Sequence, residues 1–305
     1  MSVNTLSHDH ELSAFAHARK VFQDVFWGHP LVTLCLASGI LFALLAIFAP
    51  LVAPQNPYDL MSLSIIDGRL PPFSELSDGT FSVMGTDDQG RDLFSAAIYG
   101  LRVSMGVAVA STAIALAVGL FMGLSAAMFG GWVETIVMRA VDIKLSFPTI
   151  IIALLILVIL GRGIDKVIFA LAMTQWAVYA RVSRAAALAE MQKEYIEAAK
   201  TAGAGNFFIM YRHLLPNSIS AIAVITTMQI AGAIGTEATL SFLGVGVPIT
   251  EPSLGLLIAN GYEYLLSGEY WISVFPGIVL LLLVLSFNVV GDHLREYFNP
   301  RLRKQ

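Results

Sequence analysis

Charged residues and cysteine are both scarce in this sequence. Asp, Glu, Lys and Arg make up 13% of the 305 residues, whereas an ordinary soluble domain contains about 25%. The single cysteine, Cys35, excludes an intramolecular disulfide and a thiol metal cluster. No glycine is followed by lysine, which excludes a phosphate-binding P-loop, and the net charge of −4 gives no indication of nucleic-acid binding.

Catalytic motifs are missing as well. Neither Gly-x-Ser-x-Gly nor His-Glu-x-x-His occurs in the sequence. Residues 8–11, His-Asp-His-Glu, are the one cluster that resembles a metal site, but they lie in a polar tail where solvated side chains are the favoured interpretation. We therefore expect no catalytic residue, no metal site and no enzymatic activity on this chain.

Hydrophobic residues, in contrast, make up 56% of the sequence, and they occur in long runs. A charge at the centre of a bilayer costs about 2.5–3.5 kcal/mol, and about 20 apolar residues cross it, so runs without charge locate membrane helices. The sequence predicts an all-α integral membrane protein with six spans, at 31–53, 103–129, 145–160, 167–180, 219–236 and 272–290. The fourth is short, and a buried or re-entrant segment is the alternative there.

Basic residues predict the orientation of the chain. Arg19 and Lys20 lie just before the first span, whereas the next basic residue after it, Arg69, is 16 residues beyond its end. Basic residues beside the first span favour the cytoplasmic side, so both termini are predicted to be cytoplasmic. The predicted segments are an amphipathic or loosely structured N-terminal region (1–30), an extracytoplasmic loop (54–102), a five-helix core (103–291) with a polar cytoplasmic loop (181–218), and a cytoplasmic tail (292–305).

Small residues recur along the second and fifth spans, as in the Gly119-x-x-x-Gly123 spacing and in Ala231 with Gly235. Such residues let helices approach closely, either at a pore and subunit interface or in ordinary packing within the chain. Glu237 follows the fifth span, where an interfacial, hydrated carboxylate is favoured over a gate or substrate contact. The centres of the six spans carry no ionisable side chain, which argues against an ion-coupled secondary transporter, the alternative of a different class.

The loop 181–218 is the most informative part of the sequence. Strong helix formers at 194–202 are followed by Gly203 and Gly205, and a second helical stretch at 207–215 leads to Pro216. A helix–turn–helix on the cytoplasmic face is suited to dock into a groove of another protein. Ala198 and Ala199 keep the first helix slim enough to enter such a groove.

At this point the sequence resembles a known family. Glu197-Ala198-Ala199, Gly203 and Leu215-Pro216 are similar to the EAA loop of permease subunits in bacterial type I ABC importers, although His213 stands where the general pattern has Ile. The resemblance implies that these residues form the loop that couples the permease to its ATPase. The coupling residues are thus Glu197, Ala198, Ala199, Gly203, His213, Leu215 and Pro216.

Further segments resemble the dipeptide, oligopeptide and nickel branch of that family. They are the run 85–92 (Gly-Thr-Asp-Asp-Gln-Gly-Arg-Asp), the run 240–246 (Leu-Ser-Phe-Leu-Gly-Val-Gly) and the tail from 291, and the region before the loop is similar to the C component of these systems. Asp87, Gly90, Arg91 and Asp92 form the predicted outer-face signature, with a surface pair of Arg91 and Asp92 as the plainer alternative. Glu237, Ser241 and Phe242 are the candidate pore or gate residues.

The resemblance also implies partners and a location. It predicts a heterodimer with a homologous permease subunit in a bacterial inner membrane, two cytoplasmic ATPase subunits that bind ATP and Mg, and an extracytoplasmic solute-binding protein. No cofactor is expected on this chain. Short peptides are the favoured solute, with nickel chelates, opines, glutathione or glycosides as alternatives.

Overall fold

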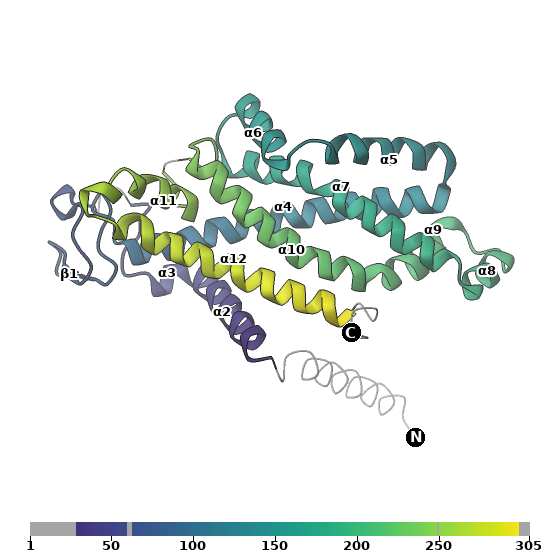
Figure 1. Cartoon of the computed structure of the whole chain (residues 1–305), viewed down its shortest axis with the longest axis horizontal. Coiled ribbons are helices and arrows are strands. Elements are labelled where there is room, and N and C mark those ends of the chain that lie inside the picture. Colours follow the sequence, from purple (N-terminus) through teal and green to yellow (C-terminus); the bar gives the residue numbers. More distant parts are fainter. Residues whose placement is uncertain (1–28, 60–62, 249, 299–305) are drawn as a thin grey trace, which may run out of the picture.

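The computed structural model describes residues 29–59, 63–248 and 250–298. Long helices dominate it and run mostly along one axis (Figure 1). The elements are α2 (Pro30–Ile47), α3 (Ala49–Val52), η1 (Ile65–Asp67), β1 (Ser74–Glu75), β2 (Phe81–Ser82), α4 (Leu93–Phe129), α5 (Gly131–Leu145), α6 (Thr149–Leu160), α7 (Ile164–Met191), α8 (Glu194–Thr201), α9 (Asn206–Ile209), the π-helix η2 (Met210–Leu214), α10 (Leu215–Phe242), α11 (Leu254–Tyr262), η3 (Leu265–Ser267) and α12 (Trp271–Phe298). The predicted all-α class is confirmed, with one short antiparallel hairpin, β1–β2, in the loop before α4.

Four helices of the described chain are long and apolar enough to cross a membrane, and α5 with α6 adds a fifth if this pair, bent by 92°, counts as one span. The predicted number of six is therefore not confirmed. The difference lies in α7, where Lys166 and Arg181 leave only the short apolar stretch 167–180 between them. The amphipathic helix predicted for the N-terminal region falls almost wholly outside the described residues.

The third predicted span, 145–160, does not form one helix. Its first residue is the last residue of α5, and the chain then bends before α6 begins at Thr149. Pro148 occupies the position before α6 with extended backbone angles. Proline has no N–H to donate and disfavours a helical residue before it, so it separates the two helices.

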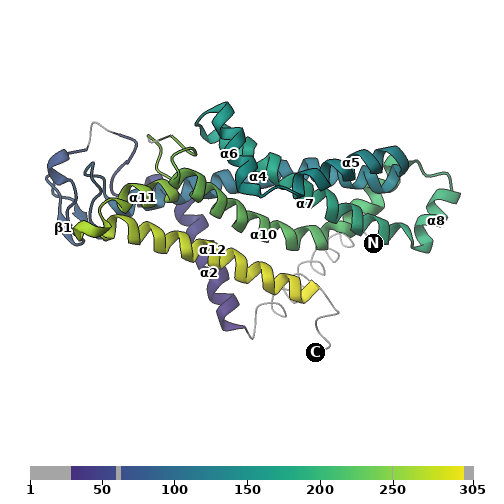
Figure 2. The same ribbon diagram turned by 45° about the horizontal axis from the view of Figure 1, so that its top comes forward.

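The helices form layers on either side of α10. In two views α4, α5 and α7 lie on one side of it, and α12 with α2 lies on the other (Figures 1 and 2). The tightest approach joins α4 to α7. A methyl group built at Gly119 would lie 2.3 Å from the backbone oxygen of Trp176, and one at Gly123 would lie 2.0 Å from Ser183 Oγ. These two glycines thus serve packing within the chain, whereas Gly106 and Gly235 face open space.

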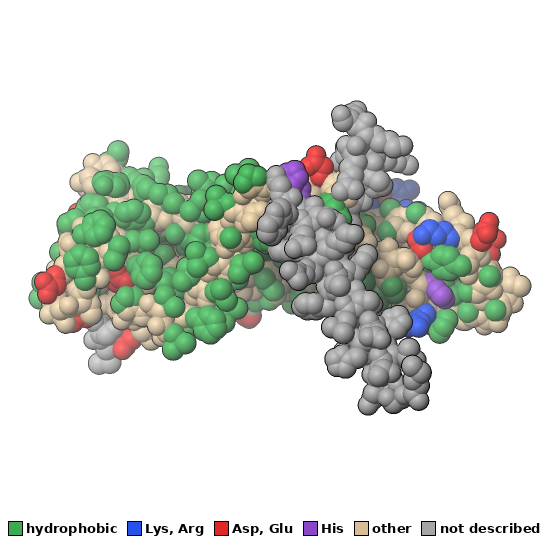
Figure 3. Space-filling model, turned by 90° about the horizontal axis from the view of Figure 1, so that it is seen from below, with side chains coloured by type: hydrophobic (Ala, Val, Ile, Leu, Met, Phe, Trp, Pro, Cys, Tyr) green, Lys and Arg blue, Asp and Glu red, His purple; other side chains and the backbone are tan. Residues whose placement is uncertain are grey.

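Apolar side chains cover much of the outer surface of the bundle. Leu34 on α2, Ile159 on α6 and Leu281 on α12 are all exposed. A view from below shows hydrophobic side chains over the part of the bundle away from α8, while the Lys and Arg side chains visible there gather toward the α8 end (Figure 3). A surface of this kind is stable only in contact with lipid or with another apolar surface.

Candidate functional site

The predicted coupling loop lies at one end of the bundle, where α8 and α9 project beyond the long helices (Figure 1). α8 ends in a glycine turn, in which the N–H of Gly203 donates to Lys200 O and that of Ala204 donates to Ala199 O. Gly203 has a φ of +85°, a left-handed conformation that glycine adopts without steric cost. The structure therefore contains the predicted helix followed by a turn at Gly203.

Three apolar side chains fasten this loop to the bundle. Ile196, Ile209 and Leu214 are fully buried and pack with Leu124 of α4 and Ala187 of α7. Burial of each side chain contributes about 1.5–3 kcal/mol. The loop is thus fixed to the ends of α4 and α7.

Polar contacts add a second connection. Lys193 Nζ lies 2.8 Å from Glu190 Oε2, and the Tyr195 hydroxyl donates to the other oxygen of the same carboxylate. Asn217 Nδ2 donates to Tyr195 Oη at 3.1 Å, which links α8 to the start of α10. The hydrogen bond to Glu190 raises the pKa of Tyr195 to about 12. Sequence reasoning did not identify Glu190 and Tyr195, because no motif or spacing marks this contact.

The predicted coupling residues divide by exposure. Glu197, Ala198, Gly203 and Pro216 are exposed, whereas Ala199, His213 and Leu215 are half-buried. The imidazole of His213 packs between Tyr195 and Phe208, with ring centroids 5.7 and 5.8 Å away.

Beside them lies an exposed aromatic face, made of Phe207, Phe208 and Tyr211. Phe207 also packs against Phe129 at the end of α4, with ring centroids 5.9 Å apart. Exposed aromatic side chains that lie together are typical of protein interfaces. Sequence reasoning did not identify this face, although its three aromatic residues fall within five positions of the loop.

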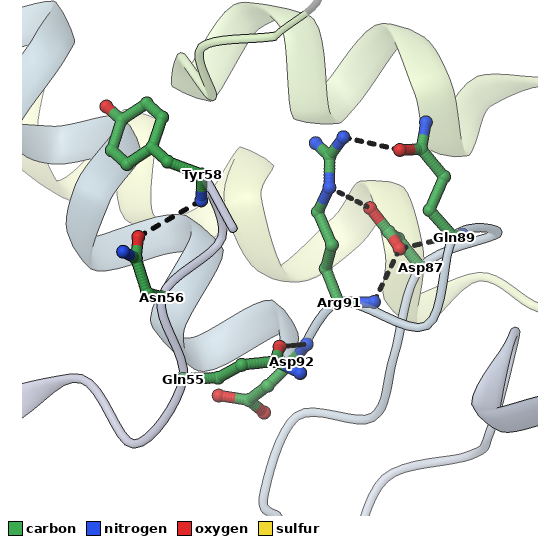
Figure 4. Close-up of polar contacts among 7 residues, drawn as sticks. All are labelled: Gln55, Asn56, Tyr58, Asp87, Gln89, Arg91 and Asp92. Atoms are coloured by element: carbon green, nitrogen blue, oxygen red, sulfur yellow. Dashed lines mark hydrogen bonds and ion pairs between the residues drawn. The ribbon is translucent and has the colours of Figure 1, made fainter. Parts of the chain in front are cut away.

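The predicted outer-face signature lies at the opposite end and is buried rather than exposed. Arg91 is only 2% exposed, and its Nε lies 4.0 Å from Asp87 Oδ2 (Figure 4). Asp87 Oδ1 accepts hydrogen bonds from the backbone N–H groups of Gln89 and Arg91, both at 2.9 Å. Burial raises the pKa of Asp87 to about 6, although the Arg91 charge opposes this change.

Asp92 is buried and bonds to other residues than Arg91, so the alternative of a surface pair between Arg91 and Asp92 is wrong. Its carboxylate caps α4 by accepting from Ser95 N at 2.8 Å, and it also accepts from Ser82 Oγ at 2.6 Å. Its backbone N–H donates to Gln55 Oε1 at 2.8 Å (Figure 4). This cap starts α4 at Leu93, ten positions before the predicted span, within the segment predicted as a loop.

The backbone turn at position 90 requires glycine. The φ of Gly90 is +77°, and a methyl group built on it would lie 2.2 Å from the Ser64 carbonyl oxygen. The signature therefore packs against an earlier part of the same loop, around Ser64.

Glu237 is fully buried, so the interpretation as an interfacial, hydrated carboxylate is wrong. Ser104 Oγ of α4 and Ser241 Oγ of α10 each donate to it at 2.7 Å. The reason is that α10 continues to Phe242 and α11 packs across its end. Ser241 is buried with it, while Phe242 is partly exposed and lies edge-on to Tyr262. The pore or gate role of these residues stays a prediction.

Comparison with protein families shows to which family the chain belongs. Residues 115–304 match the family described as "Binding-protein-dependent transport system inner membrane component". The chain belongs to this family. It is a permease subunit of a binding-protein-dependent transport system, as the resemblance of its loop 181–218 predicts.

Two curated relatives match almost the whole permease. The chain is 36% identical to the "Di/tripeptide transport system permease protein DppC" of Pseudomonas aeruginosa, over 87% of this chain and 88% of the relative. It is 35% identical to the "Dipeptide transport system permease protein DppC" of Bacillus subtilis, over 88% and 83% respectively.

A solved structure shares the fold. The permease matches a chain of the inward-facing MetNI methionine ABC transporter with a TM-score of 0.53 and 23% sequence identity, covering 67% of this chain and 97% of that one. At this identity the match supports the type I importer fold and no more.

Proposed function

We propose that this permease forms, with a homologous subunit, the pore of an ATP-driven importer for di- and oligopeptides in a bacterial inner membrane. The observation that carries the proposal is the similarity to peptide permeases over 83–88% of both chains. Related systems for nickel chelates, opines or glutathione would need the same type of pore, so the solute is tested directly below.

ATPase subunits are the proposed partners at the α8 end. The exposed side of α8, with Glu197 and Ala198, and the adjacent aromatic face of Phe207, Phe208 and Tyr211 offer a surface for docking. ATP and Mg would bind to those partners, and their closure would move α8. Because Ile196 and Leu214 are buried against the bundle, that movement would reach α4 and α7.

The α8 end is proposed to be cytoplasmic, together with both termini. Arg19 and Lys20 before the first helix support this orientation. The opposite end, with the folded segment around Asp87 and Arg91, would then face an extracytoplasmic solute-binding protein. Lipid would contact the exposed apolar side chains of α2, α6 and α12.

Purification from the native membrane tests the proposal. The tagged permease should copurify with a homologous permease and P-loop ATPases, and the complex in liposomes should take up a labelled dipeptide only with its binding protein and ATP. Uptake of a nickel chelate, an opine or glutathione instead of peptides would contradict the proposed solute. Uptake driven by an ion gradient without an ATPase would contradict the importer class.

A further inference from the structure

A cavity of about 200 Å³ lies at the break between α5 and α6, the point where the third predicted span bends. The helices α7 and α10 supply its other walls. Gln229 of α10, which lines it, is near the middle of that helix, so the cavity lies well away from both ends of the bundle. The lining residues are Lys144, Leu145, Thr149, Leu171, Thr174, Gln175, Val178, Gln229, Gly232, Ala233 and Thr236.

Gln175 lines this cavity, and within the described residues it carries a buried amide donor without a partner. Its side chain is 6% exposed, and its Oε1 accepts a hydrogen bond from Thr112 Oγ1 of α4 at 3.1 Å. The amide nitrogen, Nε2, has no hydrogen-bond partner in the part of the chain that the structure describes. An unpaired buried donor is unfavourable. A turn of this amide toward the cavity would bring the donor to an acceptor on a ligand and remove this cost.

Lys144 contributes a positive charge to the same wall. It is half-buried at the end of α5 and forms no ion pair within residues 29–59, 63–248 and 250–298. Asp142, two positions earlier, is paired with Arg181 at 2.8 Å. No acidic side chain lines the cavity, so its charge is uncompensated.

The start of α6 adds a third electropositive group. Thr149, the first residue of α6, lines the cavity, so the N-terminus of this 12-residue helix lies beside it. The first N–H groups of a helix have no acceptor within it, and they carry a partial positive charge. A lysine, two glutamines and a helix N-terminus thus surround one cavity, which is a composition suited to a carboxylate.

We propose that this cavity binds the terminal carboxylate of the transported peptide during its passage through the pore, an inference that rests on the peptide-import function proposed above. Lys144 and the α6 N-terminus hold the carboxylate, while the amides of Gln175 and Gln229 bind the adjoining peptide group. Both chemical groups are common to all peptides, so such a site accepts varied side chains.

The size of the cavity fits one end of a solute. Whole ligands occupy about 300–1,000 Å³, more than this cavity offers. A methyl group built at Gly232 would meet nothing within 4 Å, so the wall is open on that side. The rest of the peptide lies in the space between this permease and its sibling.

Uptake by the complete importer in liposomes provides the first test. Lys144→Met removes the ammonium group, and Gln175→Glu adds a carboxylate that competes with that of the peptide. Each should lower maximal uptake about tenfold at saturating binding protein. ATP hydrolysis should continue, so fewer peptides cross for each ATP consumed. Lys166→Met is the matched control, because Lys166 bonds to the backbone of Arg162 away from the cavity, and it should transport normally. Equal uptake by all three variants would overturn the proposal.

Thiol labelling provides a second readout that does not depend on activity. In a Cys35→Ala background, the thiol introduced by Gly232→Cys, at the open wall of the cavity, should react with a small polar methanethiosulfonate, read from the mass of this chain. A dipeptide with binding protein and ATP should slow that reaction severalfold, and Lys144→Met should remove the protection. Absence of labelling, or labelling at the same rate with and without peptide, overturns the carboxylate site. Peptide uptake by the wild-type complex would still support the proposed function in that case. A wild-type complex that imports no peptide would contradict the proposed function itself.

Discussion

The hydroxyl of Tyr195 in α8 donates a hydrogen bond to the carboxylate of Glu190 at the end of α7. This bond spans the turn between the long helix and the coupling loop, and Asn217 extends it to α10. It therefore fixes the angle at which α8 leaves the bundle.

Replacing Tyr195 with Phe should loosen α8 without unfolding the permease. A hydrogen bond to a charged group contributes about 1.5–3 kcal/mol, so the amides of Glu194–Thr201 should exchange their hydrogens at least tenfold faster. Hydrogen exchange followed by mass spectrometry measures this rate. Tyr211→Phe is the control, because that exposed ring takes no part in the network. Similar exchange in the two variants would contradict this role of Tyr195.

The glycine turn after α8 allows a matched pair of substitutions. Gly203 has a φ of +85°, while Gly205 has an ordinary φ of −70°, and a methyl group at either position meets nothing within 4 Å. Gly203→Ala should therefore cost about 1 kcal/mol of backbone strain and weaken ATPase binding, whereas Gly205→Ala should not. Copurification of the ATPase subunits measures the difference.

Larger changes in the same loop should have larger effects. A bulky residue at Gly203, or Glu197→Lys, should abolish uptake and ATPase association while the permease still inserts into the membrane. Normal uptake by both variants would remove the assignment of this loop as the coupling site.

The buried Asp87 should make the folded loop before α4 sensitive to pH. Its pKa is about 6 when folded, against 3.8 for an exposed aspartate, so the folded segment binds more protons between these values. Its stability should therefore fall as the pH rises from about 4 to about 6, by about 3 kcal/mol in the limit, and stay low above that.

Hydrogen exchange at the amides that donate to Asp87 tests this dependence. After correction for intrinsic rates, the amides of Gln89 and Arg91 should be better protected at pH 5 than at pH 7.5. Asp87→Asn removes the titrating group, so the protection should no longer change with pH in this range. An unchanged pH profile in that variant would assign the effect to another group.

Glu237 should matter for stability through its two serine partners. Glu237→Ala leaves the hydroxyls of Ser104 and Ser241 unpaired in a buried cavity, and should cost about 3 kcal/mol or more. Glu237→Gln keeps one acceptor and nearly the same volume, and should cost less. Thermal unfolding in detergent compares the two. A smaller loss for Ala than for Gln would argue against a structural role.

The apolar helices and the glycine turn after α8 could be predicted from sequence because their signals are local. A run without charge, or a glycine after a helix, is visible within a few residues. The burial of Glu237 depends on Ser104, 133 residues away, and on α11, so no local pattern reveals it. The same holds for Asp92, whose backbone N–H donates to Gln55, 37 residues away. Pro148 interrupts the third predicted span, 145–160. The hydrophobic run that follows it gives the stronger local signal, so the sequence pattern predicts one continuous helix there.

The contact of α4 with α7 limits how the pore can open. At Gly119 and Gly123 the two backbones approach so closely that no side chain separates them. Such a pair has no room to slide or part without losing its packing, so the two helices must turn together as one rigid unit. We therefore expect any conformational change of this permease to occur at other helix boundaries, where side chains separate the two backbones.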